Sequence, residues 1–362
     1  NIGMGPTPMT YFAHYHLKAD AAVMVTGSHN PSEYNGFKMV FDKHSFFAED
    51  IQNLQKLIDN DSLELKIGEI IYKDITQDYI KRNLLNINLK KKLKIAWDPG
   101  NGAMGRVMRE ISEKLTNSEN IIINEDVDGN FPNHHPDPTV PKNMEQLIAA
   151  VVSNKCDVGL AFDGDGDRCY MICSLGDSAN IVGGDGFLSL FLQSRSKKED
   201  FVVSVTVESS LDLSKRILAV PNGKIIETGV GDRWLQHALM RADEGVLRLG
   251  AEPSGHVVLE HSIHDDTGLW GDGILTMFEF LRMIRSCGPE WVDLFSSERG
   301  IIMSGSIFPS NRSLWNPAGE TGDLARQAVS SRFNIDCSQI HELKIEGEDD
   351  LLMMRFDDGA DW

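Results

Sequence analysis

The sequence predicts an α/β protein, and three observations lead to that fold class. Short apolar runs of strand length alternate along the chain with segments whose apolar residues recur at helical spacing. The chain has 362 residues, enough for two or three domains, and 41% of them are hydrophobic, so a large core is available. The five cysteines are odd in number and include no CxxC pair, which favours reduced thiols over a disulfide framework or a zinc ribbon.

The expected elements follow one another in β-α-β order. Runs at 22–25, 93–97, 119–124 and 158–162 predict strands, and helical spacing predicts helices at 51–58, 106–115 and 144–152. The alternation resumes with 187–192, 201–207, 211–218, 224–227 and a short strand at 246–249. This order implies parallel sheets covered by helices on both faces. We expect an ordered loop at 131–138 and a linker, or the entry to a small last domain, at 304–321; no short tandem repeat is visible.

The net charge limits the classes of partner. A formal charge of −19 argues against nucleic acid, whose affinity comes largely from Lys and Arg. A site for an anionic substrate must therefore be a local positive pocket in a negative field. No apolar run reaches the roughly 18 residues of a membrane span and no signal peptide precedes the first residue, so we expect a cytoplasmic protein with no membrane partner.

A serine is presented directly after the first predicted strand, in Thr-Gly-Ser-His-Asn-Pro at 26–31. Gly27 gives the backbone freedom and Pro31 prevents an early helix, so the hydroxyl of Ser28 is expected to be accessible. A helix N-cap is the ordinary alternative for such a serine. The neighbouring His29 and the nearby Lys38 favour phosphoryl acceptance, because they can compensate phosphate charge and assist proton transfer.

Three carboxylates follow the strand at 158–162 on alternate residues. Asp163, Asp165 and Asp167 project to one side of an extended backbone, and oxygen ligands of this kind suit Mg²⁺. The ordinary alternative is an acidic surface turn. An EF-hand is excluded, because Arg168 and Ser174 stand where its glycine and glutamate are required. Arg168 is expected to position a phosphate or a sugar hydroxyl, or else only to balance the cluster's charge.

A second glycine-rich segment favours a different function. Gly100–Gly105 matches GxGxxG, follows a strand and opens a helix, with Glu125 about twenty residues on, as in a dinucleotide-binding fold. An NAD-dependent dehydrogenase is therefore an alternative hypothesis. The same glycines also serve close packing of a helix on a sheet.

Two further groups of polar residues follow the expected strands and loops. Glu252, Ser254 and His256 lie in Glu-Pro-Ser-Gly-His after the strand at 246–249 and can hydrogen-bond sugar hydroxyls, although an ordinary turn is the simpler interpretation of this motif alone. His134 and His135 are adjacent, so their side chains diverge in extended backbone. A structural loop is the better interpretation for that pair than a metal site.

These motifs together resemble the α-D-phosphohexomutase superfamily, which includes phosphomannomutase, phosphoglucomutase and phosphoglucosamine mutase. The order and spacing of 26–31, 35–38, 98–102, 163–168 and 252–256 match those of the superfamily over almost the entire chain. The resemblance implies successive three-layer α/β domains with mixed, mostly parallel sheets around a central cleft. It also implies a partial α+β domain at the C-terminus.

The resemblance also implies a role for each motif. Ser28 would be the phosphoserine, and Asp163, Asp165 and Asp167 would hold Mg²⁺ together with one phosphoserine oxygen. His29, Lys38 and Arg168 would lie around the reacting phosphate. The substrate-binding residues would be Asp232, Arg233, Glu252, Ser254 and His256. The implied reaction moves a phosphoryl group between the 1- and 6-positions of a hexose phosphate, through a hexose 1,6-bisphosphate, in a monomer or homodimer.

The implied domains are 1–90 with the serine loop, 91–190 with the metal, 191–300 for the sugar and 301–362 as a partial fourth domain. An arginine that precedes the serine in the superfamily and the phosphate loop of its fourth domain have no counterpart here, so we expect a chain truncated at both ends. The N-terminal half most resembles phosphomannomutase/phosphoglucomutase, whereas 230–233 resembles phosphoglucosamine mutase. Of the two, the resemblance leads us to expect mannose or glucose phosphate as the substrate.

Two more alternatives stay open. The expected truncation admits an inactive sugar-phosphate-binding remnant. A phosphatase with an Asp nucleophile is disfavoured, because its pattern requires Thr or Val at the position of Asp167.

Overall fold

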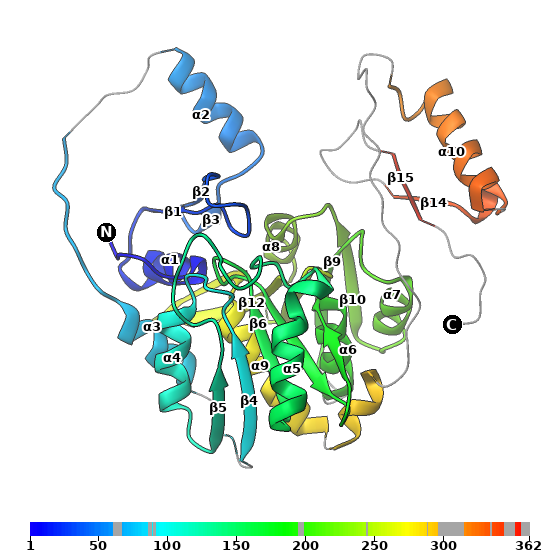
Figure 1. The fold of residues 1–362 in the computed structure, drawn as a ribbon. Helices are drawn as coiled ribbons and strands as arrows, with labels where there is room; N and C mark the ends of the chain where they lie inside the picture. The colour runs from blue at the N-terminus through cyan, green and yellow to red at the C-terminus, as the bar shows by residue number, and fades with distance from the viewer. Residues whose placement is uncertain are drawn as a thin grey trace.

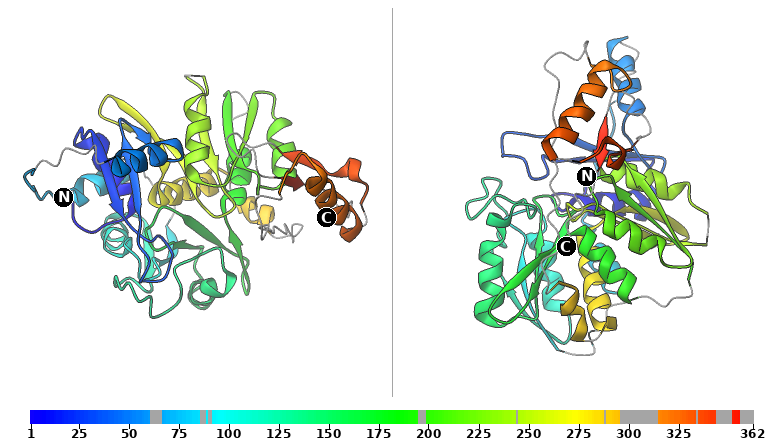
Figure 2. Two further views of the ribbon diagram at one scale, coloured as in Figure 1. Left: turned by 90° about the horizontal axis from the view of Figure 1, so that it is seen from above. Right: turned by 90° about the vertical axis from the view of Figure 1, so that its right-hand side faces the viewer.

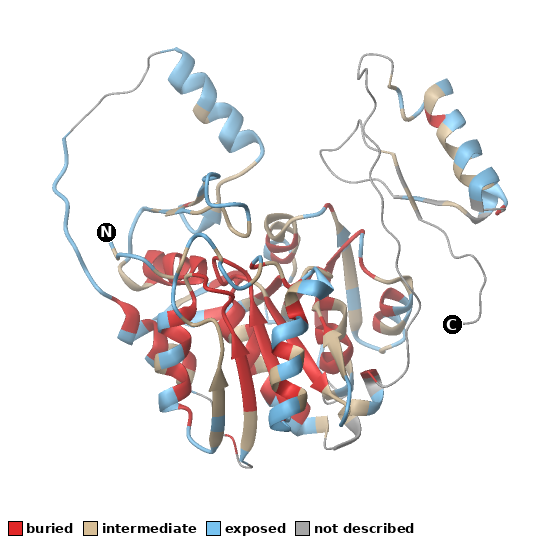
Figure 3. Ribbon diagram, viewed as in Figure 1, coloured by how far each residue is buried: buried red, intermediate tan, exposed pale blue. Residues whose placement is uncertain are grey.

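The computed structural model describes residues 1–60, 67–85, 89, 92–194, 199–243, 245–287, 289–295, 315–333, 335–343 and 352–355. Two five-stranded sheets with their covering helices form the centre of the molecule (Figure 1). A small N-terminal unit packs on them. The buried residues concentrate in the strands of these sheets and in the first helix (Figure 3).

The first sheet has the strand order β5-β4-β6-β7-β8. Its strands are β4 (Leu93–Asp98), β5 (Ser118–Ile122), β6 (Val158–Phe162), β7 (Cys169–Ser174) and β8 (Ala179–Val182). Helices α4 (Gly105–Lys114) and α5 (Glu145–Asn154) cover opposite faces of this sheet. The 3-10 turn η1 (Pro141–Met144) leads into α5. Alternate residues of β4 point to opposite faces, so Ile95 belongs to the core cluster that includes Val107 of α4, and Ala96 belongs to the separate cluster that includes Leu147 of α5.

The second sheet has the order β10-β9-β11-β12-β13. Its strands are β9 (Phe201–Thr206), β10 (Gly223–Thr228), β11 (Leu247–Ala251), β12 (Val257–Ile263) and β13 (Asp266–Gly271). Helix α6 (Gly184–Ser194) follows the last strand of the first sheet, and the helices that accompany the second sheet are α7 (Leu211–Leu218), α8 (Asp232–Met240) and α9 (Gly273–Cys287). Numbered along the chain, both sheets have the order 2-1-3-4-5 and the same β-α-β-α-β-β-β-α succession. The chain therefore repeats one pattern at domain length, which no short sequence period indicates.

Both sheets are mixed, as expected, but the antiparallel pairs are not a minority. In each sheet the first three strands are parallel, and the last two are antiparallel to their neighbours. The crossover helices α4, α5, α7 and α8 connect the parallel strands. The loop at 163–168 is too short for a crossover, so β7 has to return beside β6 as a hairpin. The β-α-β pattern predicted the parallel halves and missed the strands after them.

The N-terminal unit differs most from the sequence expectation. It contains α1 (Thr7–His16), β1 (Ala21–Val25), β2 (Phe37–Phe41), β3 (His44–Ser45), α2 (Glu49–Asp59) and α3 (Thr76–Leu84). The strand expected at 22–25 is present, but it pairs antiparallel with β2 in a three-stranded sheet. Helix α1 is buried from Thr7 to Tyr15, whereas α2 has no buried residue.

The C-terminal segment includes η2 (Pro289–Phe295), α10 (Glu320–Phe333), η4 (Cys337–Gln339) and the antiparallel pair β14 (His341–Leu343) and β15 (Met353–Arg355). Helix α10 and this pair stand to one side of the two sheets (Figures 1 and 2). Most of the linker expected at 304–321 lies outside the described residues, which resume at 315. Across the described ranges, no helix has the length and apolar character needed to cross a bilayer.

Candidate active site

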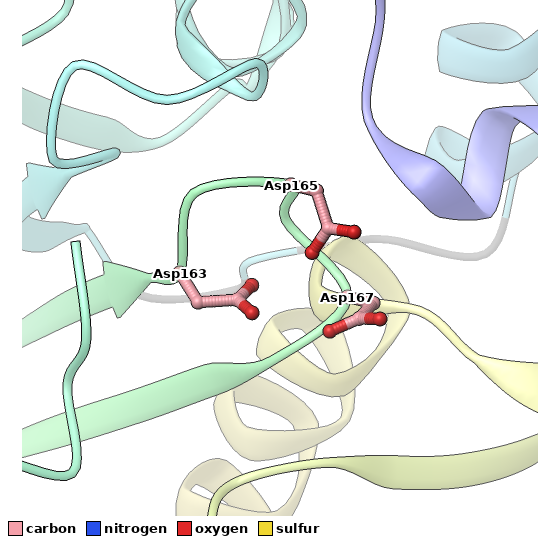
Figure 4. Close-up of side chains that lie close together, drawn as sticks. All are labelled: Asp163, Asp165 and Asp167. Atoms are coloured by element: carbon pink, nitrogen blue, oxygen red, sulfur yellow. The ribbon is translucent and has the colours of Figure 1, made fainter. Parts of the chain in front are cut away.

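The three aspartates expected to hold a metal are buried in one loop between β6 and β7. Asp163, Asp165 and Asp167 are 0%, 2% and 2% exposed, and one carboxylate oxygen from each lies within 4.8 Å of the others. Figure 4 shows that all three side chains converge on the same space. Gly166 takes φ +73°, a left-handed conformation that favours glycine and closes the loop.

The serine loop packs directly on this aspartate loop. Ser28 has φ 55°, an unusual conformation for a non-glycine residue, and its N–H donates to Thr26 Oγ1 at 2.8 Å. Its hydroxyl oxygen lies 3.3 Å from Asp163 Oδ2 and 3.3 Å from Asp165 Oδ1. A Cβ on Gly164 would collide with the carbonyl oxygen of Ser28, so glycine is needed there. The hydroxyl is thus held against two of the three carboxylates.

Two fixed cations face the carboxylates. Lys38 on β2 donates to Asp165 Oδ2 at 2.7 Å and to Asp167 Oδ2. Arg168 Nε lies 3.7 Å from Asp163 Oδ2, and the backbone N–H of Arg168 donates to Asp163 Oδ1 at 3.2 Å. Burial lowers the pKa of Lys38, but the charges of Asp167 and Asp165 outweigh that effect and hold the pKa well above its usual value. Both cations therefore stay charged.

The charges and hydrogen bonds of the three carboxylates are compatible with a bound cation. Burial, reinforced by the charges of Asp167 and Asp165, raises the pKa of Asp163 well above its ordinary value. Burial acts in the same direction on Asp167, but Lys38, His256 and Arg168 outweigh it and lower its pKa. Asp167 Oδ1 is buried and has no hydrogen-bond partner among the described residues. An all-oxygen donor set in which one buried oxygen accepts no hydrogen bond from the described residues fits a divalent metal ion.

His29 lies beside the serine hydroxyl. Its Nδ1 is 3.3 Å from Ser28 Oγ, within reach for proton transfer. Burial, and after it the charge of Arg168, lowers the pKa of His29 below its usual value. The imidazole is therefore neutral near pH 7 and can accept a proton from Ser28.

The loop expected to contact a sugar lies between β11 and β12 and joins the aspartate loop directly. Residues Arg168 and His256 form a β-bridge, and the N–H of Cys169 donates to the carbonyl of Gly255 at 3.1 Å. Within the loop, Ser254 Oγ donates to Glu252 Oε2 at 2.8 Å. The two sheets therefore bring the expected metal and sugar motifs together.

Three polar residues line the junction between the sugar loop and α8. Glu252 Oε1 accepts the N–H of Gly231 at 2.6 Å, just before α8 begins at Asp232. His256 is only 4% exposed, with Nδ1 3.6 Å from Asp167 Oδ1 and Nε2 3.5 Å from Asp232 Oδ2. Arg233 follows, half-buried, in the first turn of α8. His256 thus faces two carboxylates, and its role toward a sugar stays a prediction.

The glycine-rich segment Gly100–Gly105 packs against protein backbone. A Cβ on Gly102 would lie 2.5 Å from the carbonyl oxygen of Gly164, and the N–H of Ala103 donates to that oxygen at 2.8 Å. Glu125 Oε2 accepts from Arg109 Nε at 3.0 Å. The space and the acid that a dinucleotide would use are therefore taken by the protein itself, which argues against the dehydrogenase hypothesis.

The histidine pair forms a structural loop, as expected. His134 Nε2 lies 2.9 Å from Asp98 Oδ2, and its Nδ1 lies 2.9 Å from the carbonyl oxygen of His135. Within the described ranges, the group of His, Cys, Asp and Glu side chains spaced for a metal is Asp163, Asp165 and Asp167. Neither histidine belongs to it.

Comparison with known proteins agrees with this geometry. Three models of the phosphoglucomutase/phosphomannomutase family match in succession: alpha/beta/alpha domain I at residues 1–64, domain II at 74–176 and domain III at 183–298. The chain belongs to the phosphoglucomutase/phosphomannomutase family.

Relatives within this family differ in substrate. The chain is 35% identical over 300 residues to a phosphomannomutase/phosphoglucomutase of Pseudomonas putida, covering 82% of this chain and 62% of that protein. It is 34% identical over 311 residues to a phosphoglucosamine mutase of Clostridium novyi, covering 82% of this chain and 65% of that one. A crystal structure of a phosphoglucomutase/phosphomannomutase family protein from Burkholderia thailandensis aligns with TM-score 0.73 and 30% identity, covering 83% of this chain and 65% of that one.

Sequence reasoning missed two threonines of this candidate site. Thr7 Oγ1 donates to Asp165 Oδ2 at 2.7 Å, and Thr26 Oγ1 donates to the same oxygen at 3.2 Å. The signal available for Thr7 is its place between two prolines at the start of α1, which marks a rigid helix entry. Nothing in that pattern indicates a contact with a residue 158 positions away.

Proposed function

We propose that this protein is a phosphohexomutase in which Ser28 carries the phosphoryl group between the 1- and 6-positions of a hexose phosphate. One observation carries the proposal: the Ser28 hydroxyl lies 3.3 Å from two carboxylates of a buried, metal-suited cluster. Lys38 and Arg168 supply positive charge beside it. A family of phosphoglucomutases and phosphomannomutases supports this reaction class.

The residues around Ser28 account for the movement of the proton and the phosphoryl group. His29 accepts the hydroxyl proton as Ser28 Oγ forms a bond to phosphorus of a hexose 1,6-bisphosphate. The bond between that phosphorus and the sugar oxygen breaks, and the proton passes to the sugar oxygen. This step is preceded by its reverse: phosphorylated Ser28 gives its phosphoryl group to the free hydroxyl of a hexose monophosphate, and the resulting bisphosphate turns end for end before Ser28 takes up the phosphoryl group of its other position. Serine and sugar exchange one proton for one phosphoryl group in each direction.

Charge compensation would provide most of the acceleration, since phosphoryl transfer has a loose transition state. Lys38 and Arg168 hold fixed positive charge against the transferred group. We propose that Asp163, Asp165 and Asp167 hold Mg²⁺, which would supply further positive charge at the phosphate oxygens when bound.

For the sugar, we propose that Glu252 and Ser254 bind hydroxyls, with Arg233, Asp232 and His256 at the adjoining start of α8. Mannose or glucose phosphate is the preferred substrate. A phosphoglucosamine mutase is the second candidate, because Asp232 places a carboxylate near this loop, where it could accept a hydrogen bond from a 2-amino group. The 34% identity to the phosphoglucosamine mutase of Clostridium novyi supports this second candidate, and it is close to the 35% identity to the Pseudomonas putida enzyme.

We further propose the division 1–90, 91–190, 191–300 and 301–362 as the domains that carry the serine, the metal ligands, the sugar site and a partial fourth unit. The family matches at 1–64, 74–176 and 183–298 support the first three. A cytoplasmic location and a monomeric or homodimeric state stay predictions.

Peptide-resolved mass spectrometry tests the reaction. We expect incubation with Mg²⁺ and glucose or mannose 1,6-bisphosphate to place phosphate on Ser28. Ser28→Ala should abolish incorporation, whereas the exposed Ser32→Ala in the same loop should leave it unchanged. Asp165→Asn should reduce incorporation. Binding of the bisphosphate without phosphate on Ser28, in the folded wild-type protein, would instead identify a non-catalytic sugar-phosphate-binding protein.

A further inference from the structure

We propose that Thr7 is a positioning residue that makes Asp165 a one-oxygen ligand of the metal and so favours Mg²⁺ over larger cations. The inference rests on the proposed metal site. It concerns a residue that has no place in the phosphate chemistry and lies on a different element from the aspartate loop. The basis for this inference is the set of contacts that each carboxylate oxygen makes.

Protein donors occupy one oxygen of Asp165. Oδ2 accepts from Thr7 Oγ1 at 2.7 Å, from Lys38 Nζ at 2.7 Å and from Thr26 Oγ1 at 3.2 Å. The other oxygen, Oδ1, faces the Ser28 hydroxyl at 3.3 Å. Three donors on one oxygen fill its lone-pair directions and prevent rotation of the carboxylate. Only Oδ1 is left to meet a metal on the side of Ser28.

The other two carboxylates divide their oxygens in the same way. Asp163 Oδ1 accepts the N–H of Arg168, and its Oδ2 faces Ser28 Oγ. Asp167 Oδ2 accepts from Lys38, and its Oδ1 has no hydrogen-bond partner in the described part of the chain. Each aspartate thus offers one oxygen to the site. Mg²⁺ prefers such single-oxygen contacts in a strict octahedron, whereas Ca²⁺ takes more oxygens and readily binds carboxylates with both.

Among the donors to Asp165, the Thr7 hydroxyl makes no other hydrogen bond with the residues that the structure describes. Lys38 also binds Asp167, and Thr26 Oγ1 also accepts the N–H of Ser28. Thr7 is 0% exposed, and its N–H donates to the backbone carbonyl of Asp165 at 2.8 Å. Pro6 and Pro8 on either side fix the backbone at the start of α1. Thr7 therefore hydrogen-bonds both the main chain and the side chain of Asp165.

Isothermal titration with Mg²⁺ and with Ca²⁺ tests the role of Thr7. Thr7→Val keeps the shape and removes the hydroxyl. We expect the Mg²⁺ affinity to fall about 10-fold or more, as for other residues that orient metal ligands, with a smaller loss for Ca²⁺. Thr7→Ser should restore the preference. Thr10→Val is the matched control, because Thr10 is buried in the same helix and its hydroxyl contacts only Met24 sulfur, at 3.4 Å, in the described residues.

The outcomes separate this inference from the proposed function. An unchanged Mg²⁺ affinity in Thr7→Val overturns it, and so does an equal loss for both cations that Thr7→Ser fails to reverse. Wild-type protein that binds no Mg²⁺ overturns both the inference and the proposed metal. The expected change in selectivity, together with no phosphate on Ser28 in the wild-type protein, supports the role of Thr7 and contradicts only the mutase reaction. Melting curves without metal confirm that each variant is folded.

Discussion

At the scale of single residues, Asp98 shows how one buried carboxylate organises a loop. Its Oδ1 accepts the N–H of Gly100 at 2.9 Å and an N–H of Asn124 at 3.1 Å, while Oδ2 pairs with His134. The glycine segment, the end of the first sheet and the loop at 131–138 therefore meet at one side chain. This pair helps to hold the proline-rich loop, whose prolines lack a backbone donor.

The pair of His134 and Asp98 predicts a pH dependence. Burial lowers the pKa of His134, but the hydrogen bond and the charge of Asp98 outweigh burial and raise it above 6.5. Since the proton is bound more tightly in the folded state, its stabilisation is complete below pH of about 6.5 and is lost as the pH rises through the folded pKa. Urea unfolding from acid to alkaline pH should show this decline.

His134→Gln should flatten the decline, whereas the exposed His44→Gln should preserve it. A wild-type stability that rises over the same interval, with the slope removed by His134→Gln, would show that the pair acts in the opposite sense.

At the scale of elements, the site is a stack of three loops held by close backbone approach. The glycine segment lies against Gly164, and Gly164 lies against the carbonyl of Ser28. Side chains larger than hydrogen would separate these layers. The glycines that resemble a dinucleotide motif thus allow the aspartate loop, and through it the serine loop, to pack closely on the glycine segment.

Gly164→Ala tests this packing. The new methyl group would collide with the Ser28 carbonyl and push the serine loop away, so we expect a loss of about 1–3 kcal/mol in the free energy of unfolding. Phosphate incorporation at Ser28 should fall as well. Gly129→Ala is the control, because a Cβ there would meet no atom within 4 Å. Equal stability and incorporation for the two variants would contradict the stacked arrangement.

The elements also show how far the sequence could predict the structure. Alternating apolar runs sufficed for the parallel strands, because a buried parallel strand is a continuous apolar run. Asp163 was recognisable because it directly follows such a strand, and Ser28 because its turn comes just after the apolar run at 22–25, although that strand pairs antiparallel with β2. The returning strands β7 and β12 and the contact of Thr7 with Asp165 were not predictable, since hairpin returns and contacts over 158 positions leave no local pattern.

At the scale of the whole molecule, a buried hydrogen bond ties the N-terminal unit to the second sheet. The hydroxyl of Tyr79 on α3 donates to Asp272 at 2.9 Å, 193 positions away. Asp272 also accepts the N–H groups of Ile274 and Leu275 and thereby begins α9. Burial raises the pKa of Asp272 above its ordinary value, because it disfavours the charged carboxylate. Each hydrogen bond donated to Asp272 opposes this effect and so stabilises the charged carboxylate.

Tyr79→Phe should therefore lower the free energy of unfolding by about 2 kcal/mol, the typical contribution of a hydrogen bond to a charged group. Chemical denaturation measures it. Tyr72→Phe, at a side chain that is 76% exposed, should change stability by less than about 0.5 kcal/mol. A loss no larger for Tyr79→Phe than for Tyr72→Phe would show that Asp272 does not depend on this donor.

The repeated strand order has a consequence for where acidic residues lie. Asp163 is the first residue after the third strand of one sheet, and Glu252 is the first residue after the third strand of the other. The two hairpins that meet through Arg168 and His256 therefore occupy the same position in the strand order of their sheets. Because each hairpin begins with an acidic residue, the contact between them places a carboxylate from each sheet on either side of one junction.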